Sequence, residues 1–96
     1  MGKLPLLSES DLTARLAPLA GWARSGSTIT RTFKFAGYPE AVAFVQRTVE
    51  PAERMNHHPD IDVRYNRVIV TLSTHDSGGL TDSDVTLAQI LNSEAK

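Results

Sequence analysis

The stretch that decides the fold is Ile61-Asp-Val-Arg-Tyr-Asn-Arg-Val-Ile-Val-Thr-Leu-Ser-Thr74. Apolar and polar residues alternate along both halves of it, and this period of two indicates half-buried β-strands. The apolar positions are Ile61, Val63 and Tyr65 before the centre, then Val68, Val70 and Leu72 after it. We expect Asn66-Arg67 to form a two-residue turn, because asparagine tolerates positive φ. The stretch therefore predicts an antiparallel β-hairpin.

The flanking sequence predicts a second strand pair and three helices. Strands are expected at Trp22–Ser25 and Ile29–Phe35, and helices from Ser8 to Leu19, from Pro39 to about Met55 and from Thr81 to Leu91. Pro51 lies inside the second helix, so that helix either ends near Glu50 and restarts or carries a kink. The predicted fold class is α+β, a two-layer arrangement in the order α-β-β-α-β-β-α. A four-stranded antiparallel sheet carries three helices on one face, and residues 1–96 form a single domain.

Composition excludes several classes of function. The 96 residues have a net charge of -1 and no Lys/Arg run, so the basic footprint of a nucleic-acid binder is missing. No apolar stretch approaches the roughly 20 residues that span a bilayer. Cysteine is absent, which excludes disulfides and thiolate chemistry. The first residues show no signal-peptide pattern, and we therefore expect a cytoplasmic protein.

All three histidines flank the predicted hairpin. His57 and His58 precede one strand and His75 follows the other, each about nine residues from the turn, so that antiparallel pairing would bring them close. Imidazole can give or take a proton near neutral pH. Glu53 lies one helical turn before His57, and a neighbouring carboxylate fixes the imidazole tautomer. The pattern predicts a proton-transfer centre at one end of the sheet.

Other interpretations of these residues remain open at this point. The histidines could be unrelated surface residues, or they could bind a metal together with Asp60 or Glu53, although no HExxH motif is present. Gly78-Gly79 before a helix could cradle a phosphate or simply form a turn. Asp84 could serve only the dipole of the last helix, and Trp22 could be an ordinary core residue.

The combined pattern resembles the pterin-4a-carbinolamine dehydratase family, whose animal members are also called dimerisation cofactors of a homeodomain transcription factor. The resemblance covers nearly the whole chain. The matching elements are Gly21-Trp22, Glu53, His57-His58-Pro59, Tyr65-Asn66, Leu72-Ser-Thr-His75, Gly79-Leu80, Asp84 and Leu87-Ala88.

The resemblance implies a reaction and a site. A 4a-hydroxytetrahydropterin loses water and gives the quinonoid dihydropterin, the recycling step after aromatic amino-acid hydroxylation. His57 and His75 are implied as the acid–base pair, in roles that the sequence does not assign, while His58 binds the pterin and Glu53 orients the imidazole beside it. The implied substrate-binding set is His57, His58, Pro59, Thr74, His75, Asp76, Ser77, Trp22 and Asp84.

The resemblance also implies that no metal and no bound cofactor is needed, and that the chain forms a homodimer or homotetramer. The expected partners are the pterin and, functionally, an aromatic amino-acid hydroxylase. Two positions depart from the family pattern: Asn56 replaces an aspartate found in some relatives, and Pro51 interrupts the helix that carries Glu53. The alternative function is a non-enzymatic binding or assembly factor of the same fold. The retained histidines favour the enzyme.

Overall fold

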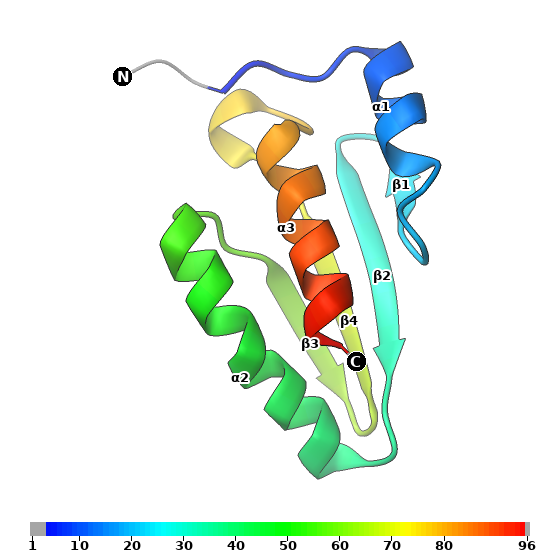
Figure 1. Cartoon of the computed structure of the whole chain (residues 1–96), viewed down its shortest axis with the longest axis vertical. Coiled ribbons are helices and arrows are strands. Elements are labelled where there is room, and N and C mark those ends of the chain that lie inside the picture. The colour runs from blue at the N-terminus through cyan, green and yellow to red at the C-terminus, as the bar shows by residue number, and fades with distance from the viewer. Residues whose placement is uncertain (1–3, 96) are drawn as a thin grey trace.

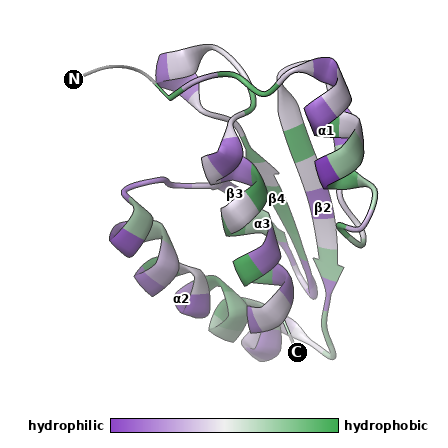
Figure 2. Cartoon of the chain, turned by 45° about the horizontal axis from the view of Figure 1, so that its top comes forward, coloured by the Kyte–Doolittle hydropathy of each residue, from purple (hydrophilic) through white to green (hydrophobic). Residues whose placement is uncertain are grey.

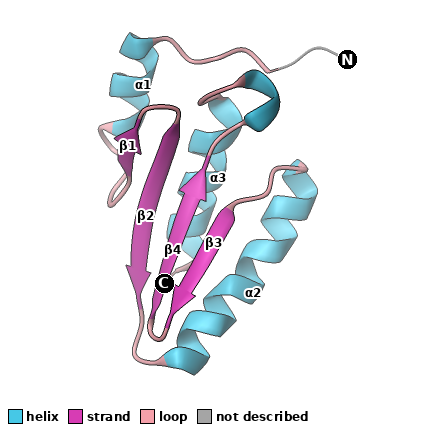
Figure 3. Ribbon diagram, turned by 180° about the vertical axis from the view of Figure 1, so that it is seen from behind, coloured by secondary structure: helices cyan, strands magenta, loops and turns pink. Residues whose placement is uncertain are grey.

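The computed structural model describes residues 4–95 and confirms the predicted α+β fold (Figure 1). The elements are α1 (Glu9–Leu16), β1 (Ala23–Ser25), β2 (Thr28–Lys34), α2 (Tyr38–Met55), β3 (Asp60–Arg64), β4 (Arg67–Leu72), a 3₁₀ turn (His75–Ser77) and α3 (Asp82–Glu94). The strands form an antiparallel sheet in the order β1-β2-β4-β3. Helices α2 and α3 lie side by side against one face of this sheet (Figure 3).

The core lies between that face and the helices. The buried apolar residues of β2 and β4 belong to it, namely Ile29, Phe33, Val68, Val70 and Leu72. Green segments mark the hydrophobic stretches of these two strands (Figure 2). Phe44 of α2 is fully buried, with its ring centroid 4.7 Å from that of Phe33 and 5.2 Å from that of Phe35. Leu87 and Leu91 close the core from α3. Among the described residues, no helix is long and apolar enough to cross a membrane.

The hairpin turn lies one residue earlier than we predicted. Arg64 pairs with Arg67, so the turn residues are Tyr65 and Asn66, and Tyr65 takes the positive φ of 53°. Asn66 is held by Phe35 instead: its carbonyl accepts from the Phe35 N–H at 2.8 Å, and its Nδ2 donates to the Phe35 carbonyl at 3.0 Å. These bonds explain the shift. The shift preserves side-chain parity, so the predicted apolar positions of β4 still face the core.

Helix α2 runs through Pro51 without ending near Glu50. The ring of Pro51 is buried, and this burial of apolar surface offsets the backbone hydrogen bond that proline lacks. The helix ends at Asn56, which adopts the left-handed conformation (φ 50°) that commonly terminates helices. This sharp ending turns the chain directly into His57, so the helix terminus places the histidine pair.

Candidate active site

One pocket brings all three histidines together. It has a volume of about 220 Å³ and is open to solvent, and its lining residues are Asn56, His57, His58, Ser73, Thr74, His75 and Asp76. One wall is the chain that leaves α2, and the other is the chain that leaves β4. The two walls meet because β3 and β4 pair antiparallel, which returns residue 74 to the end of the sheet where residue 59 enters it.

His57 is bonded to a fully buried carboxylate. Its Nε2 lies 2.6 Å from Oδ1 of Asp84, and the His57 side chain is only 11% exposed. The other carboxylate oxygen, Oδ2, accepts from the Thr74 hydroxyl at 2.7 Å and from the Thr81 backbone N–H at 2.9 Å. The second bond is half of a capping box at the start of α3. Asp84 therefore joins the start of α3, the chain that follows β4, and His57 in one hydrogen-bonded network.

This network favours one tautomer of the His57 imidazole. An ionised carboxylate only accepts hydrogen bonds, so Nε2 of His57 donates to Asp84. The remaining ring nitrogen, Nδ1, is then the one that can exchange a proton with a ligand. A buried carboxylate in this position also stabilises the imidazolium that forms when Nδ1 takes a proton.

Glu53 pairs with His58 and not with His57. Its Oε2 lies 2.6 Å from Nε2 of His58, and both side chains are largely exposed, at 69% and 56%. Solvent screens such a pair strongly, so its contribution to stability is small. The pair instead holds the His58 ring at the edge of the pocket.

His75 faces the pocket from a short turn. It begins the 3₁₀ turn after β4, and none of the three residues of that turn is buried. The turn closes on itself through a bridge between Thr74 and Gly79, with the Thr74 N–H donating to the Gly79 carbonyl at 2.9 Å. Gly78 ends the turn at a φ of 76°, a conformation that favours glycine.

Four residues of the expected substrate-binding set do not line this pocket. Trp22 is a buried core residue whose Nε1 donates to Oδ1 of Asn92, near the end of α3 opposite to Asp84. Pro59 leads into β3, and the hydroxyl of Ser77 donates to the backbone carbonyl of Leu4 at 2.6 Å. Asp84 touches the pocket only through His57 and Thr74, since it is fully buried.

Two lining residues were not among the predicted site residues. Asn56 and Ser73 each precede a predicted residue directly, and both line the pocket. The signal for Asn56 was its place between a helix and the histidine pair, where a left-handed residue is needed. Ser73 lies within the Leu72-Ser-Thr-His75 match to the family, but it was not assigned a role.

The metal alternative finds no matching ligand set in the described residues. Within residues 4–95, no three or more His, Asp or Glu side chains are grouped so that they could hold a metal ion. The two carboxylates beside the site instead each contact a different histidine.

Comparison with known proteins identifies the family. The family model described as pterin 4 alpha carbinolamine dehydratase matches residues 5–93. A relative from Nostoc, provisionally named pterin-4-alpha-carbinolamine dehydratase, is 47% identical over 87 residues, which are 91% of this chain and 94% of the relative. The chain belongs to the pterin 4 alpha carbinolamine dehydratase family. The resemblance expected from the sequence is thereby confirmed.

One solved structure supports membership of the dehydratase family, and a second shares the fold. The crystal structure of a transcriptional coactivator/pterin dehydratase from Brucella melitensis has a TM-score of 0.92 and 37% identity, and covers 96% of this chain and 100% of that one. A pterin dehydratase-like protein identified as a RuBisCO assembly factor in the alpha-carboxysome has a TM-score of 0.63 and 20% identity, covering 77% of this chain and 86% of that one. The second likeness concerns the fold alone.

Proposed function

We propose that this protein dehydrates a 4a-hydroxytetrahydropterin to the quinonoid dihydropterin by histidine acid–base catalysis. The observation that carries the proposal is the pocket that joins all three histidines, in which His57 is backed by the buried carboxylate of Asp84. Family membership supplies the substrate class, because the family model and the Nostoc relative carry the name of this reaction.

The reaction needs two proton transfers. A base removes the proton on N5 of the pterin, the electrons of that bond form the C4a=N5 double bond, and the C4a–O bond breaks. Hydroxide is a poor leaving group, so an acid must protonate the oxygen, which then departs as water. Both steps need side chains that can give and take protons around one ligand, a role to which imidazole is suited, and the three histidines line one pocket.

The surroundings of the two histidines favour different roles. His57 has a carboxylate behind it that stabilises its protonated form, an arrangement found where imidazole acts as a base. We therefore assign the N5 proton to Nδ1 of His57. His75 lies exposed on the opposite wall and can regain a proton from solvent after each turnover, which suits the acid. Before the next turnover, His57 would release its proton to solvent and His75 would take one up from solvent.

The decisive experiment is a dehydration assay with the wild-type protein and a freshly generated pterin carbinolamine. We expect the rate to exceed that of the uncatalysed reaction in the same buffer, and chelator-treated protein to retain it. A non-reacting oxidised pterin should shift the NMR signals of all three imidazoles together. If the rate stays at the uncatalysed level and no imidazole signal responds, the chain is not a pterin dehydratase.

Glu53→Gln should affect binding more than chemistry. The substitution removes the charge next to His58 but keeps the side-chain length, and the original pair is exposed and screened. We expect KM to rise about two- to fivefold with kcat nearly unchanged, an effect that shrinks in high salt. Glu50→Gln is the matched control, because Glu50 lies on the same helix and pairs with Arg54 away from the pocket. A large fall in kcat would place Glu53 in the chemistry instead.

The wider role follows from the substrate. A reaction that leaves a hydroxyl group on C4a of a tetrahydropterin must precede this step, and aromatic amino-acid hydroxylation is the class that the family resemblance implies. Assembly into a homodimer or homotetramer belongs to the same proposal. The non-enzymatic alternative draws on the Brucella structure, whose name includes transcriptional coactivator, and on the more distant RuBisCO assembly factor, which is similar in fold alone. The wild-type assay separates this alternative from the enzyme.

A further inference from the structure

The turn that carries His75 is held mainly by hydrogen bonds. We call residues 74–79 the His75 turn. His75, Asp76 and Ser77 have no buried side chain among them, so packing contributes little to the position of this turn. Its base is fixed, because Thr74 is buried and bonded to Asp84. Its tip, with the imidazole of His75 and the residues after it, needs another anchor.

The segment before α1 provides that anchor. We call residues 4–7 the N-terminal strap, and it passes over the His75 turn. In Figure 1 the strap is the blue segment and the turn is the yellow segment beside it, and in Figure 2 the strap is largely green because it is hydrophobic. The Ser77 hydroxyl donates to the Leu4 carbonyl at 2.6 Å, and the Leu7 N–H donates to the Leu80 carbonyl at 3.0 Å. The strap therefore bonds on both sides of the two glycines that end the turn.

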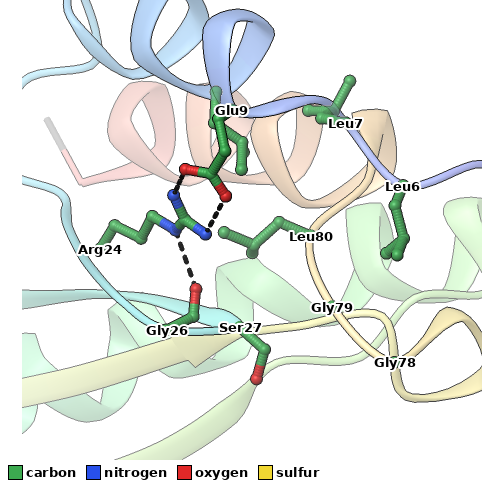
Figure 4. Close-up of a pocket in the computed structure, with 10 residues that line it drawn as sticks. Leu6, Leu7, Glu9, Arg24, Gly26, Ser27, Gly78, Gly79 and Leu80 are labelled. Atoms are coloured by element: carbon green, nitrogen blue, oxygen red, sulfur yellow. Dashed lines mark hydrogen bonds and ion pairs between the residues drawn. The ribbon is translucent and has the colours of Figure 1, made fainter.

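A close contact adds to these hydrogen bonds. A Cβ atom built on Gly79 would lie 3.1 Å from Cδ2 of Leu6, so the Leu6 side chain rests against the backbone of the turn (Figure 4). Glycine at position 79 lets the strap approach this closely. Leu6 is 56% exposed, so it contacts the turn without being part of the hydrophobic core.

The far end of the strap is anchored in the body of the protein. Leu7 packs against the core, and the next residue, Ser8, caps α1 by accepting from the Asp11 N–H. Glu9 forms a two-pronged ion pair with Arg24, at 2.6 and 2.9 Å (Figure 4). The Arg24 guanidinium, chiefly through these hydrogen bonds, holds the pKa of the Glu9 carboxyl below its ordinary value. This anchor stays ionised at neutral pH.

We propose that Ser77 is a positioning residue: through its bond to the N-terminal strap, it holds the His75 turn in the geometry that catalysis needs. The inference rests on the proposed function for its catalytic consequence. Ser77 was expected to contact the substrate, yet its hydroxyl is bonded to the strap and the residue does not line the pocket. The two roles predict different kinetics.

The variant Ser77→Ala distinguishes a positioning role of Ser77 from a direct contact with the substrate. Loss of one positioning hydrogen bond should lower kcat about three- to tenfold and leave KM nearly unchanged, because the substrate loses no contact. Ser77→Thr keeps the hydroxyl and should restore kcat. Leu6→Ala should also lower kcat, and its effect should be less than additive with that of Ser77→Ala, since both act through the strap. Ser93→Ala, at an exposed serine of α3, is the control.

A second measurement does not depend on activity. In Ser77→Ala, amide exchange at residues 75–79 should quicken and the His75 imidazole signals should broaden or shift, while those of His57 stay in place. A rise in KM alone would make Ser77 a substrate contact and overturn the proposal. Amide exchange and His75 signals that stay unchanged in Ser77→Ala would also overturn the proposal. If the wild-type protein fails to dehydrate the pterin, the proposed function fails, and the exchange measurement still decides whether the strap holds the turn.

Discussion

His57→Ala is expected to lower kcat for pterin dehydration by about 10²–10⁴-fold, the usual contribution of one general acid or base. The substitution removes Nδ1, the only ring nitrogen of His57 left free once Nε2 has donated to Asp84. Steady-state kinetics with the carbinolamine measures the loss. Added imidazole should recover part of the rate, because the substitution leaves a space beside the Asp84 carboxylate.

The other two histidines provide matched comparisons in the same pocket. His75→Ala should lower kcat to a similar extent, since it removes the proposed acid. His58→Ala should mainly raise KM, because His58 is held at the rim by Glu53 and lacks a buried partner. Thermal unfolding of each variant separates lost chemistry from lost structure. Equal losses of kcat in all three variants, or none in His57→Ala, would contradict the assignment of roles.

Much of the fold was predictable because local patterns and tertiary packing agree. Strand alternation and the helix caps at Ser8 and Thr81 each specify one element without help from distant residues. The turn position was not predictable in this way. It depends on the bonds between Asn66 and Phe35, which lie 31 positions apart in the chain. The course of α2 through Pro51 likewise depends on how deeply that proline is buried.

The gathering of the three histidines was predictable from the sequence, but the carboxylates that His57 and His58 contact were not. Spacing around the hairpin brought the three histidines to one end of the sheet, which needed only antiparallel pairing. The sequence pointed to Glu53 as the carboxylate one turn before His57, whereas Asp84, 27 positions away, is the one that contacts it. Asp84 also completes a capping box, and this local pattern gave no sign of its second bond. Pairings of this kind depend on how α3 docks on the sheet.

Asp84→Asn should lower kcat by about 10²-fold or more while the protein stays folded. The amide oxygen of asparagine can still accept from Thr74 and from the Thr81 N–H, so the cap of α3 survives. The amide nitrogen then faces Nε2 of His57 and donates to it. The imidazole must carry its hydrogen on Nδ1 instead, which leaves no acceptor facing the substrate. The NMR signals of the ring nitrogens would show this change of tautomer.

Asp84→Ala provides the contrast, because it removes the acceptor altogether. The Thr81 N–H and the Thr74 hydroxyl lose a buried partner, and His57 loses its carboxylate, so we expect the free energy of unfolding to fall by about 3–5 kcal/mol. Chemical denaturation measures this, with Asp82→Ala as the control at an exposed position of the same helix turn. If the asparagine variant is stable and fully active, the carboxylate serves only the helix cap. If it is stable and slow, the carboxylate that caps the start of α3 also sets the tautomer of His57.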